Sequence, residues 1–370
     1  MVAPVKIARI EVIPLKIPYE RVGNPSGWAR QGFATLATTL LRVETEDGLV
    51  GWGDAFSYNC QRAVQAAIED MVAPVVLGRD ARDIAGIMLD LQKLLHLFGR
   101  YGITVFALSG LDIALWDLAG KRARKPLVEL LGGPARTELE AYASLFRLHD
   151  REIVAEQTRE ALALGYRYIK LHETQEPEVK VAREAAGPSI PIMVDTNCPW
   201  TPAEARENAL KLKKYDLHWL EEPIFPPENF RALAALGAET GIPIAAGENA
   251  CTSFEFEKML AAGAVTYAQP SVTKVGGITE FRKVAALVEA AGVSLMPHSP
   301  YFGPGFLATL HLAAAHPASS LVERFYLKVE ASLYGDIVNP VRGKFRLPDG
   351  PGLGREPDAN VIKTYRVKSD

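Results

Sequence analysis

The N-terminal third of the chain shows two hydrophobic periods in succession. Residues 5–15 and 36–45 alternate apolar and polar positions and are rich in β-branched side chains, which is typical of strands with one buried face. An Asp-Gly dipeptide that favours a hairpin turn follows the second stretch. Residues 61–97 and 104–124 instead repeat their apolar positions at helical spacing. Strands followed by helices predict an α+β unit over residues 1–133.

A different pattern begins at residue 134. A short apolar run, a loop and an amphipathic helical stretch recur there about every 25 residues, and several helical stretches end in glycine, a common helix stop. The apolar runs span residues 139–144, 166–172, 191–197, 217–223, 243–249, 265–270, 293–299 and 320–325. Eight runs with intervening helices predict an α/β fold, a (β/α)8 barrel of the TIM type, over residues 134–330. Residues 331–370 are turn-rich, leave the last helix undefined, and are expected to return to the N-terminal unit.

Three consecutive runs end in a carboxylate, at Asp195, Glu221 and Glu248. Their separations of 26 and 27 residues match one strand–helix unit, so we expect them on neighbouring strands at one height. Three adjacent carboxylates repel one another unless a cation lies among them, and ligation by oxygen alone favours a hard ion such as Mg²⁺. The alternative is that these acids pair with lysines or are solvated in loops. That alternative suits one isolated carboxylate better than three at matched register.

Nitrogen bases flank this predicted metal site. Lys170 and His172 end the second run, where residues two apart share a face of the strand, and His298 ends the seventh run. A carboxylate substrate bound to Mg²⁺ would expose its α-carbon to the bases on both sides of the metal site. The ion and a lysine could stabilise the ene-diolate left when the α-proton is removed. The alternative is that His172 and His298 are structural, the role expected for His96, His149, His218, His311 and His316.

Composition and charge exclude several classes of function. The 370 residues carry a formal net charge of -3, with 48% hydrophobic and 23% charged residues, which is average for a soluble globular protein. We find no dense basic run and no apolar stretch near the roughly 20 residues of a membrane span, so neither nucleic acid nor membrane is expected as a partner. The three cysteines are scattered without a CxxC motif, which favours a reducing compartment. Because the N-terminus also lacks a signal-peptide pattern, we expect a cytoplasmic protein.

Short motifs along the chain resemble the enolase superfamily, and specifically its mandelate racemase and muconate lactonising enzyme branch. In chain order they are "GLVGWGDA", "ALSGLDIALWDLAGK", "VDTN", "WLEEP", "AGEN", "QPSVTKVGGITE", "MPHSP" and "PDGPGLG". The resemblance implies that residues 1–133 form a capping domain over the barrel, completed by residues 331–370. It also implies that Asp195, Glu221 and Glu248 bind Mg²⁺, and that the protein is a homo-oligomer.

The resemblance assigns further residues to the site. Lys170 and His172 match the family's lysine-x-lysine pair, and His298 matches the acid–base group of the seventh barrel strand. Glu323 matches an acid on the eighth strand that hydrogen-bonds the substrate carboxylate. Asn197 matches a neighbour of the metal or substrate.

Two residues depart from the family pattern. His172 replaces the second lysine, and a histidine can be neutral near pH 7 without heavy desolvation, so it can act directly as a base. Ser271 stands where the family usually has an aspartate that orients His298, and a serine brings no negative charge. This pattern fits one base and one acid, the division that dehydration or ring opening requires, better than the two matched bases of a racemase.

Substrate contacts are expected from loops at the barrel mouth. Trp28 and Arg30 lie in the first loop of the capping domain, which closes over the site in this family, and Tyr301, Ser271 and Asn197 follow barrel strands. Such groups suit a hydroxylated carboxylate, so we predict an acid-sugar dehydratase acting on an aldonate or aldarate. A cycloisomerase or a racemase or epimerase of a related acid remains open. So does a barrel that has lost catalysis and serves as a binding protein.

Overall fold

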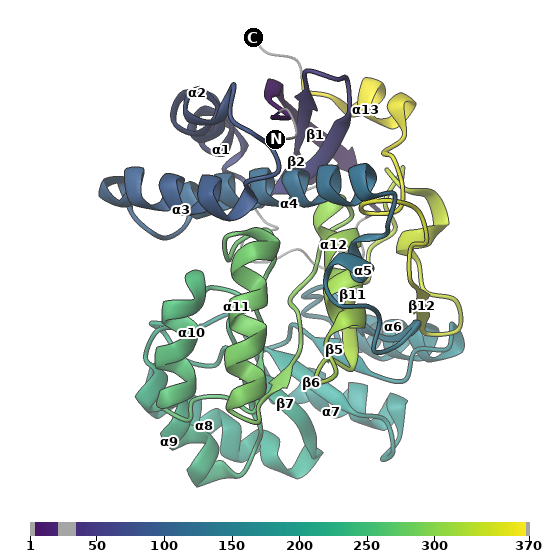
Figure 1. The fold of residues 1–370 in the computed structure, drawn as a ribbon. Helices are drawn as coiled ribbons and strands as arrows, with labels where there is room; N and C mark the ends of the chain where they lie inside the picture. The colour runs from purple at the N-terminus through teal and green to yellow at the C-terminus, as the bar shows by residue number, and fades with distance from the viewer. Residues whose placement is uncertain (1–3, 21–34, 368–370) are drawn as a thin grey trace.

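The computed structural model describes residues 4–20 and 35–367, with the capping domain above the barrel in Figure 1. An antiparallel sheet of order β1-β2-β3 begins the chain, and the helices of the capping domain follow it. The strands are β1 (Ile7–Pro18), β2 (Thr35–Thr45) and β3 (Val50–Ala55). The helices are α1 (Gln61–Ala66), η2 (Ala67–Val72), α2 (Ala73–Val76), α3 (Ile84–Leu94), η3 (His96–Phe98), α4 (Ile103–Ala123) and α5 (Leu127–Leu130).

Helix α4 packs directly on β3 because glycines remove the side chains between them. A Cβ atom on Gly53 would lie 2.0 Å from the carbonyl oxygen of Gly110, and one on Gly51 would lie 2.3 Å from that of Ala114. By length and composition α4 could cross a membrane, so the expectation that no apolar stretch approaches that length was wrong. However, 78% of its most apolar window is buried inside the protein, which makes α4 the core helix of the capping domain.

Eight parallel strands form the barrel and follow one another in chain order. They are β4 (Glu138–Ser144), β5 (Ile169–Leu171), β6 (Ile192–Asp195), β7 (Leu217–Glu221), β8 (Ile244–Ala246), β9 (Tyr267–Ala268), β10 (Ser294–Leu295) and β11 (Leu321–Phe325). β11 pairs with β4, and Leu295 of β10 pairs with Ser319 just before β11, which closes the ring. The predicted α/β fold, a (β/α)8-type barrel with an N-terminal α+β domain, is therefore confirmed.

Helices connect the successive barrel strands and surround them (Figure 1). Glycines with positive φ, Gly187 and Gly241, end α7 and α9, as the glycines after the helical stretches indicated. The seven helices are α6 (Arg151–Ala163), α7 (Glu176–Ala186), α8 (Pro202–Leu212), α9 (Phe230–Thr240), α10 (Thr252–Ala261), α11 (Gly277–Ala290) and α12 (Pro304–Ala315).

In the described chain, no further α-helix separates β11 from the strand β12 (Lys344–Arg346), which pairs antiparallel with β4. The intervening segment holds only the short 3₁₀ helix η5 (Gly335–Val338). The chain then returns to the capping domain. Helix α13 (Ala359–Tyr365) lies against β1, and the backbone N–H of Val367 donates to the carbonyl of Pro14 at 2.9 Å.

Side chains from the capping domain hold the N-termini of two barrel helices. Asp112 of α4 accepts a hydrogen bond from the backbone N–H of Thr279 in α11 at 2.8 Å. Asp54 of β3 accepts one from Gly305 in α12 at 2.5 Å. Each carboxylate therefore satisfies an N–H group that the helix itself leaves unpaired.

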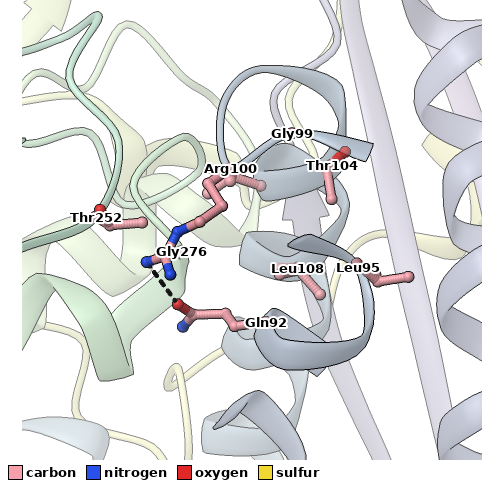
Figure 2. A pocket seen from close by; sticks show the side chains of 9 residues that line it. Gln92, Leu95, Gly99, Arg100, Thr104, Leu108, Thr252 and Gly276 are labelled. Atoms are coloured by element: carbon pink, nitrogen blue, oxygen red, sulfur yellow. Dashed lines mark hydrogen bonds between the residues drawn. The ribbon is translucent and has the colours of Figure 1, made fainter. Parts of the chain in front are cut away.

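Another part of this interface is shown in Figure 2. Arg100 and Gln92, joined by a 3.5 Å hydrogen bond, face Thr252 and Gly276 of the barrel across a cavity of about 10 Å³. That space suits a single water molecule. The two domains are thus packed closely on this side, and a larger cavity among the described residues lies elsewhere.

Candidate active site

The site forms where the barrel interior changes from apolar to polar. The lower interior is filled by Tyr142, Met193, Trp219, Ala245, Met296 and Leu321. Residues two positions apart on a strand point to the same face. Asp195 lies two positions after Met193, and Glu221 lies two positions after Trp219. The same step leads from Met296 to His298 and from Leu321 to Glu323. The strand alternation therefore places a polar layer directly above the apolar layer.

Three carboxylates of this layer meet at the ends of β6, β7 and β8. One oxygen from each of Asp195, Glu221 and Glu248 lies within 4.8 Å of the others. Asp195 pairs in register with Glu221 across β6 and β7, as the matched spacing predicted. Glu248 follows Gly247, whose φ of +135° turns the chain away from β8.

Lys170 lies beneath the cluster, fully buried. Its Nζ is 3.2 Å from Asp195 Oδ2, 2.9 Å from Glu221 Oε1 and 3.0 Å from Glu323 Oε1. Burial alone would lower the pKa of Lys170, but Glu221 and Glu323 outweigh it and raise that pKa well above its usual value. Lys170 is therefore a fixed cation within this cluster.

The pKa values of the three carboxylates shift in different directions. Burial raises the pKa of Asp195, but Lys170 and His172 outweigh it and hold that pKa well below its usual value. Burial and the neighbouring Asp195 raise the pKa of Glu221 well above its usual range. Burial would raise the pKa of Glu248, but His298 and Lys274 lower it to about 2. Negative charge here exceeds what the lysines balance, and all the donors are oxygens, so the cluster fits a hard divalent cation.

His172 approaches the cluster from β5. Its Nε2 lies 3.1 Å from Asp195 Oδ2, and its Nδ1 lies 2.5 Å from the carbonyl oxygen of Leu145. Arg147 Nε donates to the backbone carbonyl of His172. Arg147 Nη2 also donates to Asn197 Oδ1 at 2.9 Å, and Asn197 Nδ2 donates to Asp195 Oδ1 at 2.9 Å. Asn197 thus adjoins the cluster, close to the position that the resemblance implied.

His298 approaches the cluster from β10. Its Nε2 lies 2.9 Å from Glu248 Oε2, and its Nδ1 lies 3.3 Å from Ser271 Oγ and 3.4 Å from Tyr301 OH. The two hydroxyls also contact each other. Ser271 and Tyr301 were expected at the substrate, but both are buried behind the His298 ring and neither lines the cavity.

Glu323 completes the layer from β11. It accepts a hydrogen bond from the backbone N–H of Ser299 at 2.9 Å, in addition to its contact with Lys170. Burial would raise the pKa of Glu323, but Lys170 and His298 outweigh it and keep that pKa below its usual value.

A cavity of about 710 Å³ opens above these groups, between the barrel mouth and the capping domain. Its polar wall includes Arg147, Glu222, Asn249 and Lys274, and the pKa of buried Glu222 is raised to about 8 by burial and by Glu248. The capping domain contributes mostly apolar or aromatic groups: Tyr19, Leu36, Ala37, Phe56, Tyr58 and Phe106. Trp28 and Arg30 lie outside the described residues.

The sequence interpretation missed Glu222 and Asn249 as parts of this wall. Each directly follows a predicted metal ligand, in "EEP" and "GEN", and Asn249 Nδ2 donates to Glu222 Oε2 at 2.7 Å. The signal was therefore present in the doubled polar residue after each strand. Strand alternation alone would have turned these second residues away from the site.

A capped barrel with an acidic cluster between basic side chains at its mouth defines an enzyme of the enolase class. Residues 153–361 match the family "Enolase C-terminal domain-like", and residues 10–132 match "Mandelate racemase / muconate lactonizing enzyme, N-terminal domain". The chain belongs to the mandelate racemase and muconate lactonizing branch of the enolase superfamily.

Characterised relatives extend this comparison. The chain is 33% identical to arabinonate dehydratase of Saccharolobus solfataricus, covering 96% of this chain and 98% of that protein. It is 36% identical to 3,6-anhydro-alpha-L-galactonate cycloisomerase of Streptomyces coelicolor, covering 85% and 87%. The crystal structure of a racemase from Streptomyces coelicolor with bound magnesium superimposes with a TM-score of 0.85 at 32% identity, over 98% of this chain and 100% of that one. The protein is therefore an enzyme of this superfamily, and its relatives include proteins named as a dehydratase, a cycloisomerase and a racemase.

Proposed function

We propose that this protein is a Mg²⁺-dependent dehydratase that removes water from an aldonate or aldarate to give a 2-keto-3-deoxy acid. The observation that carries the proposal is the cluster of Asp195, Glu221 and Glu248, flanked by His172 and His298 beneath a cavity with a polar wall. A carboxylate substrate needs a cation at its head group and a base at its α-carbon, and this arrangement offers both.

Each residue has a defined part in this proposal. Asp195, Glu221 and Glu248 would hold the ion, which when bound supplies positive charge to the substrate carboxyl group. Lys170, fixed as a cation by its carboxylate neighbours, adds a second positive charge beneath the same group. One histidine removes the α-proton and the other protonates the departing hydroxyl. Glu323, which lines the cavity close to Lys170, would hydrogen-bond the substrate carboxyl group.

The same first step also serves a cycloisomerase, and one relative bears that name. A cycloisomerase forms or opens a ring after the α-proton has moved, so its product has the mass of its substrate. Both reactions need an acid for the departing oxygen as well as a base, and His298, 2.9 Å from Glu248, is the second such group beside the cluster. A hydroxyl group leaves far more readily when such an acid protonates it.

The test is a panel of aldonates, aldarates and their lactones, incubated with protein that has been treated with chelator and then reloaded with Mg²⁺. Formation of a 2-keto-3-deoxy product from at least one acid, lost on chelation, is the expected result. An isomer of unchanged mass would replace the proposal with a cycloisomerase or epimerase. Absence of both reactions and of any α-proton exchange across the panel would leave the binding-protein alternative.

A further inference from the structure

The cavity above the carboxylate cluster has two unlike walls that face each other across the barrel mouth. In the ring of strands, β7, β8 and β9 lie opposite β11, β4 and β5. Polar residues that line the cavity follow the first three of these strands: Glu222, Asn249 and Lys274. On the other side Phe325 ends β11 and Phe146 follows β4, with ring centroids 5.9 Å apart. One wall therefore offers hydrogen-bonding groups, and the other offers carbon surface.

Hydrogen bonds join the three residues of the polar wall. Lys274 Nζ donates to Asn249 Oδ1 at 3.2 Å, and Asn249 Nδ2 donates to Glu222 Oε2 at 2.7 Å. Glu222 has a φ of +43°, which is uncommon for a residue other than glycine. This conformation turns its side chain into the cavity, against the alternation of the strand before it. Such backbone strain concentrates at functional sites.

Lys274 has fewer partners than a buried lysine needs. Only 5% of the residue is exposed, and its one ion pair among the described residues is with Glu248 Oε1, 3.6 Å away. Glu248 also pairs more closely with His298, at 2.9 Å. An ammonium group has three hydrogens to donate, and Asn249 accepts one of them. Lys274 therefore keeps donors at the cavity wall, where an oxygen of a bound molecule can accept from them.

The capping domain holds Lys274 in position. Its Nζ lies 4.9 Å from the centre of the Phe56 ring, which is a cation–π contact. Phe56 directly follows β3, and its backbone N–H donates to the carbonyl of Thr273 at 3.4 Å. These contacts restrict a side chain that is otherwise flexible. The charge of Lys274 is thereby kept at one place on the polar wall.

We propose that Glu222, Asn249 and Lys274 form a subsite for a hydroxyl group that the substrate carries beyond C3. This subsite rests on the proposed function, in which C1 lies at the cluster and C2 and C3 react. A hydroxyl both donates and accepts, so it matches a wall that offers the ammonium group of Lys274 and the carboxyl group of Glu222. A hydroxyl can donate to a carboxylate or accept from a carboxylic acid, so Glu222 binds it in either state.

The two walls together define the substrate class more narrowly. The substrate is a polyhydroxy acid with a hydroxyl at C4 or C5 that faces β7–β9, while carbon-bound hydrogens of the same chain face Phe146 and Phe325. An acid without that hydroxyl would leave buried donors of Lys274 unpaired, which costs more than one lost hydrogen bond. Sites built to bond a substrate hydroxyl therefore discriminate strongly against analogues that lack it.

The first experiment compares related acids in full-length, Mg²⁺-loaded protein. The acids are the best substrate of the panel and two analogues, one without the C4 hydroxyl and one without the C5 hydroxyl. Wild type should prefer the complete acid over at least one analogue by about 100-fold or more in kcat/KM. Lys274→Met should reduce this preference to about tenfold or less, because it loses most for the complete acid. Lys180→Met removes an exposed lysine of α7 and should keep the wild-type preference.

The second experiment tests Phe56 as a positioning residue. Phe56→Leu keeps an apolar side chain but removes the ring face from Lys274, so the preference for the complete acid should fall about three- to tenfold. Phe146→Leu alters the opposite wall and should change kcat/KM for all three acids alike. A merely structural role of Phe56 would leave the ratio unchanged, so an unchanged ratio would contradict its positioning role.

A binding measurement separates failure of the subsite from failure of the proposed function. Calorimetry gives the affinity of each panel acid and its two analogues for the Mg²⁺-loaded protein, whether or not a reaction follows. If no acid reacts, but wild type binds a complete acid more tightly than an analogue and Lys274→Met does not, dehydration is refuted and the subsite stands. Equal affinity for all three acids in wild type, an undiminished preference in Lys274→Met, or failure of every panel acid to bind would overturn the subsite.

Discussion

Arg147 joins three barrel strands at the mouth of the site. It lies in the loop after β4 and donates to the carbonyl groups of His172 and Thr196 and to the side chain of Asn197. Asn197 in turn donates to Asp195. No carboxylate among the described residues pairs with Arg147, so its fork of donors serves to position the groups around the cluster.

Replacing Arg147 by lysine tests this positioning role, because lysine keeps the charge and loses the fork. Arg147→Lys should lower kcat about 10- to 100-fold. Arg206→Lys alters an exposed pair with Glu239 and should leave kcat unchanged. Full activity in the Arg147→Lys protein would contradict the positioning role, because it would show that the fork of donors is not needed.

Lys170 stabilises the fold as well as the site. Three carboxylates lie within 3.2 Å of its Nζ, all buried. Lys170→Met would leave them unbalanced and should destabilise the protein by about 3 to 5 kcal/mol in chelator. Mg²⁺ should recover part of this loss in a thermal melt, because it returns positive charge to the cluster. Lys211→Met removes an exposed pair with Glu207 and should change the melt little. Equal losses with and without Mg²⁺ would contradict this account.

At the scale of elements, the close packing of α4 on β3 fixes the capping domain. No side chain fits between Gly53 and Gly110, where a Cβ atom would lie 2.0 Å from a backbone oxygen. Gly53→Ala should therefore lower stability by about 1 to 3 kcal/mol or more, measured by thermal or urea unfolding. Gly48→Asn is the control, since that turn has open space around it and asparagine tolerates its positive φ. Similar stability of the two variants would refute the packing argument.

The contacts between capping domain and barrel helices should also depend on pH. Burial raises the pKa of Asp54 to about 7 and that of Asp112 to about 7. An acid whose pKa is higher in the folded state binds more protons there, so its contribution to stability falls as pH rises from about 4 to 7 and is constant above.

Asp54→Asn imitates the protonated acid and keeps an oxygen that can accept from Gly305. Relative to wild type, this variant should gain about 2 to 4 kcal/mol of stability at pH 8, and the gain should shrink toward pH 4. Thermal melts across this range measure it. A loss of stability at pH 8 would show that the folded protein keeps Asp54 charged at the end of α12.

Across the whole molecule, the sequence pattern predicted what depends on local periodicity. Alternation along each strand placed Asp195 and Glu221 on the inner face, and the repeat length placed them on neighbouring strands. The pattern could not predict groups brought together by turns and by packing between domains. Tyr301 reaches behind His298 through the loop after β10, and Asp54 reaches α12 from the other domain. Such contacts depend on the paths of loops, whose sequences show no hydrophobic periodicity.

The central claim is that the three carboxylates bind one divalent ion. Calorimetric titration of chelator-treated protein with Mg²⁺ tests it directly, comparing wild type with Glu221→Gln and Glu222→Gln. Adjacent Glu222 is buried and acidic but outside the cluster, so it is a matched control. We predict one ion per chain in wild type and in Glu222→Gln, with affinity lowered at least about 100-fold in Glu221→Gln. No binding in wild type, or equal binding in all three proteins, would contradict the account.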